Sequence, residues 1–463
     1  MISRLDPLST LRALRRHPYV AREEIVAFQN KQLRRLVAHA YDNVPYYRKL
    51  FIRHGLTPHD IQSVADLSAI PITSKKDLQS LPVGEVVTRD VDPKRLLTHR
   101  TSGSSGEPFT IRRTWFEDRL LHQFRRRAMR DFGSRSTDRG ANVVLVRPGH
   151  PSGNRLPLRI LQALDSIHQS LGLYRRVRIN CLLPPRDIVY ALRDFRPDVL
   201  SGFPGVLARL APIISDDDRL VIRPRLIVVG AEVLTPLMRR RIAEAFSALV
   251  FDCYGSHEFN LLAWECKDAG GFHVCDDSVI VEVLKDGRPV GAGERGEVIG
   301  TNLHSFAMPF IRYRLGDIVT RGSETCRCGQ PFSTIRNIQG RMLDYFPLPD
   351  GRLLHPYEIV LLLIGDADSW VKQYQLTQEQ EDRVVLRVVP SHTPSLRQLA
   401  VLEESGAALL GDRVKFQVVL VPEIQLEPNG KFRVSRSLVK SDYDGLNWEP
   451  RPSPYPHTNS RPD

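Results

Sequence analysis

Short apolar runs alternate with helical patterns through the middle of the chain. Asn142–Val146, Leu226–Val229 and Leu249–Tyr254 have strand length, and helical stretches lie between them at Arg186–Phe195 and Pro236–Phe246. A strand–helix–strand order favours parallel strands, and helices then cover both faces of the sheet, which is why such strands are apolar throughout. The alternation therefore predicts an α/β fold built on a largely parallel, buried sheet.

The residues that precede this core predict helices. Leu33, Leu36, Val37 and Ala40 are spaced by three and four residues, as on one face of a helix. The sequence Asn-Val-Pro at 43–45 ends that pattern, because a proline disfavours helical backbone in the residue before it.

The pattern changes after about Asp276. Val279–Leu284 and Glu297–Thr301 have strand character, and the Asp286-Gly287 pair that follows the first run is typical of a hairpin turn. We expect these two runs to pair as antiparallel strands. The large domain should therefore combine a parallel α/β part with an antiparallel β part.

A third region begins past Gly340. It holds strand patterns at Val384–Val389 and Phe416–Val421 with a helical pattern near Leu396–Glu404, which predicts a small α+β domain. Prolines fill the last segment, and its few apolar residues predict a flexible tail. The expected division is an N-terminal domain over 1–341 that starts with a helical segment, a small C-terminal domain over 342–444, and a tail over 445–463.

The composition excludes several classes of protein. Of the 463 residues 42% are hydrophobic, which is enough for a sizeable core. No run approaches the roughly 18 consecutive apolar residues of a membrane-spanning helix. The N-terminal residues lack the apolar core of a secretory signal, so we expect a cytoplasmic protein. Six cysteines cannot hold together a disulfide scaffold of this length, which leaves thiols or a metal site as their uses.

The chain carries 65 Lys and Arg against 53 Asp and Glu, a net charge of +12. Such a balance suits nucleic acid, an anionic membrane surface or polyanionic small molecules. No nucleic-acid-binding motif is present, so no nucleic-acid partner is expected. The densest basic cluster is interpreted as a solvated helix face; it consists of Arg112, Arg113, Arg119, Arg125, Arg126, Arg127 and Arg130.

A Gly- and Ser-rich segment, Thr-Ser-Gly-Ser-Ser-Gly-Glu-Pro, covers 101–108. Glycines let the backbone approach a ligand closely, and exposed N–H and O–H groups suit phosphate oxygens. The segment is not a Walker A loop, because no Gly-Lys-Ser/Thr follows. A flexible linker is the alternative interpretation.

Two further segments carry acids near predicted strands. Tyr254-Gly-Ser-His-Glu258 directly follows a buried run, where a carboxylate can hold a divalent cation and a tyrosine can stack on a base. Tyr313-Arg-Leu-Gly-Asp317 ends in an acid that can accept both hydroxyls of a ribose. An ordinary strand-to-loop turn and an Asx turn are the respective alternatives.

The small C-terminal region contributes two more segments. Gly340-Arg-Met-Leu-Asp344 stands where that region begins, and a plain linker between domains explains it equally well. Pro428-Asn-Gly-Lys431 is a turn that presents one lysine, which a solvated hairpin tip also explains.

In their order along the chain, these segments resemble the motifs of the adenylate-forming superfamily of acyl-CoA synthetases. Within it they are most similar to the phenylacetate–CoA ligase and CapK-like branch. The resemblance extends from about Gln29 to about Arg436 and includes Asn43-Val-Pro-Tyr-Tyr-Arg48 and Ile72-Thr-Ser-Lys-Lys-Asp77. It implies a small C-terminal domain that is mobile and rotates between two half-reactions.

The resemblance also implies roles for residues at matching positions. Glu258 would hold Mg²⁺, Lys431 would act in the adenylation step, and Asp317 would bind the ribose. Gly340-Arg341 resembles the hinge, and Tyr254 with Gly255 belongs to the motif whose tyrosine stacks on adenine. The phosphate-binding loop would consist of Thr101, Ser102, Gly103, Ser104, Ser105 and Gly106, and the adenine-contacting segment of Gly230, Ala231 and Glu232.

The implied function is ATP-dependent activation of a carboxylic acid to an acyl-adenylate with release of pyrophosphate, followed by transfer to coenzyme A. ATP, Mg²⁺, CoA and a small carboxylic acid would be its cofactors and partners. Two alternatives stay open: an adenylating enzyme without CoA transfer that serves polysaccharide or secondary-metabolite assembly, and a non-catalytic polyanion binder. The identity of the acid and the oligomeric state cannot be deduced from these residues.

Four of the cysteines, together with one histidine, lie in two short groups, 266–275 and 326–328. A Cys-x-Cys pair followed by glycine can direct two thiolates at one ion, and a second pair would complete a tetrahedral Zn²⁺ site. The preferred ligands are Cys266, His273, Cys326 and Cys328, with Cys275 as the substitute for His273. Free thiols are the alternative. Cys181 and Cys253 are expected in the core.

Overall fold

The structure is a computed structural model that describes residues 14–100, 109–144, 146, 176–181, 183–268, 270–338, 346–351, 353–354, 370–425 and 435–439. It divides into two compact units, each described by itself below. The larger consists of Met1–Gly340 with Gln425–Arg433, and the smaller of Arg341–Ile424 with Val434–Asp463. Among the described helices, none combines the length and the apolar character that crossing a membrane requires.

The larger unit is organised around one sheet, which has 12 strands among the described residues. Five of these strands are mutually parallel and follow the order β4-β3-β5-β6-β7. Most of their apolar side chains are buried, although Leu249 at the start of β7 is exposed, and this burial confirms the predicted α/β core. They are β3 (Gly140–Val144), β4 (Arg176–Asn180), β5 (Val199–Gly202), β6 (Leu226–Gly230) and β7 (Leu249–Tyr254).

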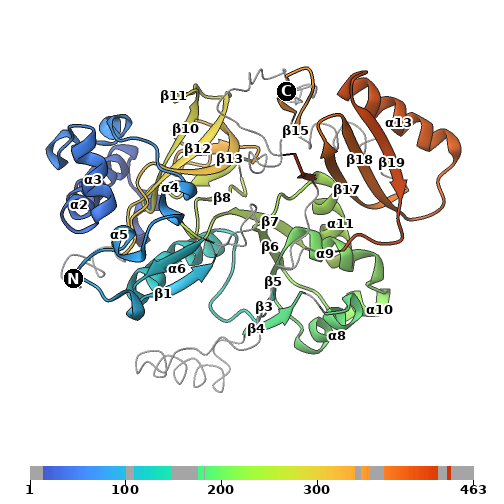
Figure 1. Ribbon diagram of the computed structural model, residues 1–463. Coiled ribbons are helices and arrows are strands. Elements are labelled where there is room, and N and C mark those ends of the chain that lie inside the picture. The colour runs from blue at the N-terminus through green and yellow to red at the C-terminus, as the bar shows by residue number, and fades with distance from the viewer. Residues whose placement is uncertain are drawn as a thin grey trace, which may run out of the picture. The chain divides into compact units, whose positions relative to one another are not determined.

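Helices of the expected kind cover the parallel strands (Figure 1). The predicted helix over 236–246 is observed over the same residues, and the one predicted from Arg186 starts one residue earlier, because proline is favoured at the first helical position. Ile188, Leu207 and Ile242 from three of these helices pack with strand residues in one core cluster. The helices are α8 (Pro185–Phe195), α9 (Pro204–Leu210), α10 (Asp216–Val221) and α11 (Pro236–Phe246).

The sheet continues from β7 into an antiparallel part in the order β8, β9, β14, β13, β12, β10, β11. The two predicted runs pair as β10 and β12, with Val279 opposite Asn302. The turn at Asp286-Gly287, where both residues have positive φ, leads first into the short β11, which the sequence analysis missed. The strands are β8 (Ala263–Glu265), β9 (Phe272–Val274), β10 (Val279–Lys285), β11 (Arg288–Pro289), β12 (Arg295–Asn302), β13 (Tyr313–Arg321) and β14 (Thr334–Arg336).

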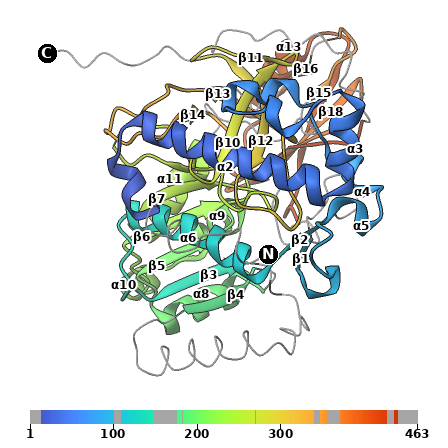
Figure 2. The same cartoon turned by 90° about the vertical axis from the view of Figure 1, so that its left-hand side faces the viewer.

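The N-terminal helices pack on this antiparallel part. α2 (Arg22–Asn43) ends where the Asn-Val-Pro sequence predicts, and α3 (Pro45–Arg53) begins at the proline. Leu33, Leu36 and Val37 share a core cluster with Ile280 of β10, and Figure 2 shows α2 crossing in front of that strand. Two short helices follow, α4 (Lys75–Gln79) and α5 (Val83–Val86).

A hairpin and a long helix connect these helices to the parallel strands. β1 (Leu97–Arg100) and β2 (Thr110–Arg113) pair antiparallel, and α6 (Trp115–Asp131) starts with a capping box between Thr114 and Glu117. The sequence predicts that the basic cluster on this segment is mostly solvated surface, and two of its members depart from that prediction. Arg113 and Arg127 are buried, and the spacing of Arg127 from Phe124 places it on the inner face of α6.

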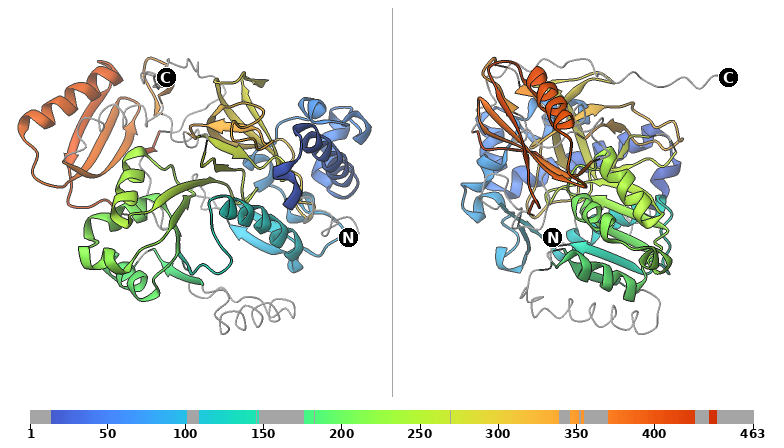
Figure 3. Two further views of the ribbon diagram at one scale, coloured as in Figure 1. Left: turned by 180° about the vertical axis from the view of Figure 1, so that it is seen from behind. Right: turned by 90° about the vertical axis from the view of Figure 1, so that its right-hand side faces the viewer.

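The smaller unit is an α+β domain. Among its described residues the sheet has four strands in the order β19-β18-β17-β20, and α13 links the parallel pair β18 and β19 along one face of the sheet (Figure 3). α13 extends six residues past its predicted end, and a Cβ on its Gly406 would lie 2.1 Å from the Phe416 ring, so the glycine permits close packing. The elements are β15 (Phe346–Pro347), β16 (Leu353–Leu354), β17 (Val371–Gln380), β18 (Arg383–Pro390), α13 (Leu396–Leu410), β19 (Lys415–Leu420) and β20 (Ser435–Ser437).

Candidate nucleotide-binding and metal sites

Two of the predicted motifs meet at the carboxyl end of β7. Tyr254 is the last residue of that strand, and its buried hydroxyl donates a 2.7 Å hydrogen bond to Oδ2 of Asp317 on β13. Gly255 allows the chain to turn sharply here, since a Cβ at this position would lie 2.1 Å from the carbonyl oxygen of Asn260. An aromatic ring and a carboxylate are thus fixed side by side at the edge where open α/β sheets bind ligands.

Glu258 lies in the same turn and is held by its neighbours. The Tyr313 hydroxyl donates to its Oε1 at 3.3 Å, and the Asn302 side-chain amide donates to its backbone carbonyl at 2.9 Å. The residue is 7% exposed. A buried carboxylate fixed in this way can offer a hard oxygen ligand to a divalent cation that is also bound to phosphates, as Mg²⁺ sites in nucleotide-dependent enzymes require.

The Gly230–Glu232 segment lies beside this turn, because Gly230 is paired with Cys253 across β6 and β7. A Cβ at Gly230 would come within 2.5 Å of the Cys253 carbonyl oxygen, and Ala231 has φ +67°. The Glu232 carboxylate accepts a 3.0 Å hydrogen bond from the Gly205 N–H in the first turn of α9. Its side chain therefore has a structural role in addition to any contact with a ligand.

The two early stretches of the resemblance position the start of β13. The Tyr47 hydroxyl donates to the Pro309 carbonyl at 3.1 Å and accepts from the Ile311 N–H at 3.0 Å. Thr73 donates its N–H to the Arg312 carbonyl and accepts from the Arg314 N–H, at 2.9 and 2.8 Å. Both contacts fix the strand that carries Tyr313 and Asp317, so these stretches have a supporting role.

Several predicted site residues lie outside the described residues, so their geometry does not enter the site. They are the loop residues Thr101, Ser102, Gly103, Ser104, Ser105 and Gly106, together with Arg341 and Lys431. The strands that lead into and out of the loop are described, with Arg100 paired to Thr110 at its base.

The structure brings together Cys266, His273, Cys326 and Cys328, whose potential ligand atoms all lie within 4.8 Å of one another. Cys266 follows β8, His273 lies on β9, and the other two occupy the turn between β13 and β14 at Gly329, which has φ +90°. β9 pairs with both β8 and β14, so the end of β8, the strand β9 and the turn before β14 bring the four side chains to one place.

The distances in this cluster suit a tetrahedral ion. Tetrahedral Zn²⁺ with normal bond lengths separates two thiolates by about 3.8 Å and a thiolate from an imidazole nitrogen by about 3.6 Å. The Cys266 and Cys326 sulfurs are 3.7 Å apart, and Cys328 Sγ lies 3.3 Å from His273 Nε2. Burial lowers the pKa of His273 to about 4, so its ring is neutral near pH 7 and offers a lone pair.

The other cysteines occupy different surroundings. Cys275 Sγ lies 3.3 Å from Nη2 of Arg127, and it is not among the clustered ligands. Cys181 and Cys253 are buried in the apolar core, as predicted.

The C-terminal part of the chain, residues 350–437, matches the model of the CapK C-terminal domain. The phenylacetate-coenzyme A ligase of Pseudomonas putida is 27% identical over 481 residues, covering 95% of this chain and 96% of the relative. That of Thermus thermophilus is 27% identical and covers 85% and 86%, and the CapK protein of Staphylococcus aureus is 22% identical and covers 90% of each. Over most of its length the chain is therefore similar to the phenylacetate–CoA ligases and to CapK, and its C-terminal part matches the CapK C-terminal domain.

A solved adenylate-forming enzyme has the same fold. The crystal structure of 2-hydroxyisobutyryl-CoA ligase, in the postadenylation state with 2-HIB-AMP, superposes with a TM-score of 0.75 and 21% identity. The match covers 92% of this chain and 91% of that chain. It extends over the large N-terminal α/β part and the small C-terminal part, in agreement with the predicted fold class.

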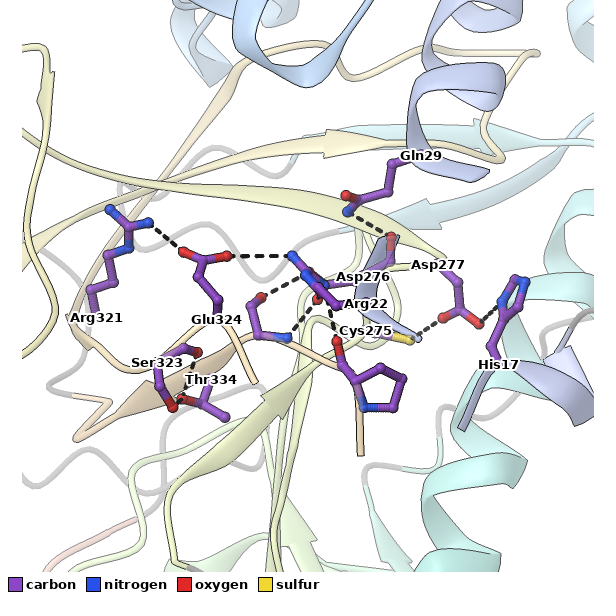
Figure 4. A network of polar contacts seen from close by, with 12 residues as sticks. His17, Arg22, Gln29, Cys275, Asp276, Asp277, Arg321, Ser323, Glu324 and Thr334 are labelled. Carbon is purple, nitrogen blue, oxygen red and sulfur yellow. Dashed lines mark hydrogen bonds and ion pairs between the residues drawn. The ribbon is translucent and has the colours of Figure 1, made fainter. Parts of the chain in front are cut away.

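A buried ionic network adjoins the candidate sites, and the sequence analysis missed it. Arg127 donates two hydrogen bonds to Asp277, at 2.5 and 2.8 Å, and His17 Nδ1 lies 2.8 Å from the same carboxylate. The neighbouring Asp276 contacts Arg22 of α2 and accepts from the Ser333 N–H and hydroxyl (Figure 4). The network joins the N-terminal segment to the loops beside the cysteine cluster. The adjacent acids after β9 were its only signal in the sequence.

Proposed function

We propose that this chain is an AMP-forming carboxylate–CoA ligase. It would activate a carboxylic acid with ATP, release pyrophosphate, and pass the acyl group from the adenylate to the thiol of coenzyme A. The observation that carries this proposal is the contact between Tyr254 and Asp317 beside the buried Glu258, in a chain whose full-length relatives include phenylacetate–CoA ligases.

The nucleotide would bind at the carboxyl edge of β6 and β7. Gly230, Ala231 and Glu232 with the ring of Tyr254 would hold the adenine, and Asp317 would accept the ribose hydroxyls. The Tyr254–Asp317 hydrogen bond supports this division of roles, because it fixes the ring that stacks and the acid that binds ribose in one arrangement. The loop residues Thr101–Gly106 would donate to the phosphates.

The chemistry needs positioning and compensation of negative charge. A carboxylate oxygen of the substrate attacks the α-phosphorus of ATP, the bond to the β-phosphate oxygen breaks, and pyrophosphate leaves. In the second step the CoA thiol loses its proton and attacks the acyl carbon, and AMP leaves. Mg²⁺ bound to the phosphates would neutralise their charge when present, with Glu258 as its protein ligand. Lys431 would stabilise the charge that develops during adenylation.

We also propose that Cys266, His273, Cys326 and Cys328 hold a structural Zn²⁺, an assignment supported by their clustering and by the distances between their ligand atoms. Asp131 would support it: its carboxylate accepts from Trp264 Nε1 and Gln330 Nε2 and lies 3.9 Å from His273 Nδ1. That nitrogen is a buried polar atom without a hydrogen-bond partner among the described residues. The ion would connect β8, β9 and the turn before β14, next to the nucleotide motif. It would have a structural role and take no part in catalysis.

An assay of pyrophosphate exchange tests the main proposal. The purified protein is given labelled pyrophosphate, ATP and a panel of aryl, aliphatic and amino acids, with and without CoA. Acid-dependent exchange together with formation of a CoA thioester is the expected result. Exchange without a thioester would instead identify an adenylating enzyme that does not use CoA. The absence of exchange with every acid in the panel would favour the polyanion binder.

A further inference from the structure

Two adjacent arginines at the end of β2 lie in different surroundings. Arg113 is 3% exposed, whereas Arg112 is only half-buried. β2 is the strand that leaves the 101–108 loop, and in its register with β1 Leu97 lies opposite Arg113. Burial of a guanidinium costs free energy unless charges or hydrogen bonds compensate it, so the contacts of Arg113 show which interactions offset that cost.

The contacts of Arg113 lock the base of the hairpin to α6. Its Nη1 lies 3.7 Å from Oδ1 of Asp118, in the first turn of α6. The same oxygen is 2.9 Å from Nε2 of His99, on the strand that enters the loop. Burial raises the pKa of Asp118, but the close contact with His99 and the charges of His122, His99 and Arg113 bring it below its usual range. The ionised carboxylate of Asp118 thus contacts one side chain from each strand of the hairpin.

The other side of the guanidinium contacts the motif that contains Glu258. Nη2 of Arg113 donates to the carbonyl of His257, the residue immediately before Glu258. The next carbonyl, that of Glu258, accepts from Asn302, and its carboxylate accepts from Tyr313. Arg113 is therefore the charged member of the three side chains that fix this turn, and it reaches the turn from the hairpin that carries the loop.

Arg113 keeps its positive charge in these buried surroundings. Burial lowers the pKa of Arg113, while the charges of Asp118, Glu117 and Glu258 raise it again, and arginine remains protonated in proteins. Its Nε is a buried donor without a hydrogen-bond partner among the described residues. The guanidinium thus remains a positive charge with donor capacity to spare, next to the acid proposed to hold Mg²⁺.

We infer that Arg113 is a positioning residue for adenylation, which fixes Glu258 relative to the base of the phosphate-loop hairpin. Mg²⁺ bound to ATP must meet a protein carboxylate and the nucleotide phosphates at the same time, so an error in this separation weakens both contacts. The inference rests on the proposed function. It predicts that Arg113 matters for the gain in ATP affinity that Mg²⁺ provides, more than for ATP binding without the ion.

Calorimetric binding of ATP, with Mg²⁺ and with EDTA, tests this on four full-length proteins: wild type, Arg113→Met, Arg113→Lys and the control Arg112→Ala. Thermal unfolding first verifies that each is folded. We expect wild type and Arg112→Ala to bind ATP more tightly with Mg²⁺ than with EDTA. Arg113→Met should lose most of this gain, so that its affinity for ATP with Mg²⁺ is about tenfold lower than that of wild type. Arg113→Lys should recover part of it, since lysine keeps the charge but not the forked donor geometry.

Several results would overturn the inference. One is a folded Arg113→Met protein with the full Mg²⁺ gain, and another is an equal loss in Arg112→Ala, which would indicate a general effect of charge. If Arg113→Met does not fold, an Arg113→Lys protein with an unchanged gain overturns it. Wild-type protein that binds no ATP would instead refute the proposed function, so the two failures are distinguishable.

Discussion

The Tyr254 hydroxyl and the Asp317 carboxylate are 63 residues apart in sequence and share one buried hydrogen bond. At the scale of single residues the candidate site is built from such pairs. One member has a shape or charge that suits the nucleotide, and the other holds it in place. Tyr313 relates in the same way to Glu258, and Arg113 to His257. A conservative change in a partner should therefore weaken ligand binding without unfolding the protein.

Tyr254→Phe removes this hydrogen bond and keeps the ring. A hydrogen bond to a charged group contributes about 1.5 kcal/mol or more, so KM for ATP should rise about tenfold with a smaller change in kcat. Steady-state pyrophosphate exchange at varied ATP measures both constants. Tyr190→Phe alters an exposed tyrosine on α8 and should leave KM unchanged. An unaltered KM in Tyr254→Phe would contradict the assignment of this pair to the nucleotide site.

Asp277 gives a prediction for the pH dependence of stability. Burial by itself raises the pKa of Asp277. The charge of Arg127 and the hydrogen bond from His17 have the larger effect and hold this pKa well below its usual range. The pair therefore stabilises the fold fully above the pKa of an unfolded aspartate, about 4, and this contribution is lost as the pH falls below that value.

Asp277→Asn should accordingly cost about 3–5 kcal/mol at pH 7, because Arg127 would remain buried without its counter-charge. Urea unfolding at pH 7 and at pH 3.5 measures the free energy of unfolding, and the difference from wild type should shrink at the lower pH. Glu24→Gln breaks an ion pair with Arg16 on the surface and should cost little at either pH. If Asp277→Asn lowers the free energy of unfolding as little as Glu24→Gln does, the ionic network adds no stability.

At the scale of elements, α6 links the two candidate sites. Arg113, the last residue of β2 just before α6, donates to the His257 carbonyl, and Glu117 in the first turn of α6 accepts from the N–H groups of Phe306 and Ala307. Near its end Arg127 binds Asp277, and Asp131 supports the cysteine cluster. Its buried arginine also lies over the rings of Trp264 and Phe332, so one helix positions both the nucleotide motif and the strands that carry the cluster.

The cluster predicts one zinc per chain, measurable by mass spectrometry of the purified protein. Cys328→Ser should lose the metal and lower the unfolding temperature, because the ion connects β8, β9 and the turn before β14. Asp131→Asn should keep the site but weaken its affinity about 10- to 100-fold in a chelator competition. Cys181→Ala, a buried cysteine outside the cluster, should retain the zinc. Wild-type protein without stoichiometric zinc would rule out the site.

At the scale of the whole molecule the chain forms two compact units of unequal size. We propose that the region over 342–444 works as a lid domain in adenylation, although the stretch Gln425–Arg433, which includes Lys431, groups with the larger unit. Domain closure of this kind excludes water and completes a catalytic site only when the substrate is bound. Lys431 and the hinge residue Arg341 lie outside the described residues, as does the predicted tail over 445–463.

Lys431→Ala tests the lid proposal. Loss of the positive charge that stabilises the transition state should reduce pyrophosphate exchange by about 100-fold or more. ATP binding by calorimetry should change little, because the proposed nucleotide contacts of Tyr254, Glu258 and Asp317 remain intact. Lys415→Ala, on the exposed first residue of β19, is the matched control and should keep its activity. Full exchange activity in Lys431→Ala would refute the proposed role.

The sequence by itself determined much of the fold, because burial imposes periodic patterns. β6, β7, α11 and the paired strands β10 and β12 lie where their apolar residues predict. Elements without such a signal were missed. β4 is an edge strand whose Arg176 and Arg178 face outward, and β17 is rich in glutamine. Their pairing depends on neighbouring strands, which no local pattern encodes.

The tertiary structure decided which of the candidate side chains meet. The sequence left His273 and Cys275 as alternatives for one metal ligand, since both follow Cys266 at suitable spacing. Pairing of β9 with β14 places His273 opposite Thr334, beside the cysteines of the preceding turn, whereas Cys275 lies next to Arg127. Arg113 and Arg127 likewise look like surface charges in the sequence, but contacts with the distant residues His257 and Asp277 help to compensate their burial. Such contacts join residues more than 140 positions apart, because folding, not sequence spacing, sets the distances between them.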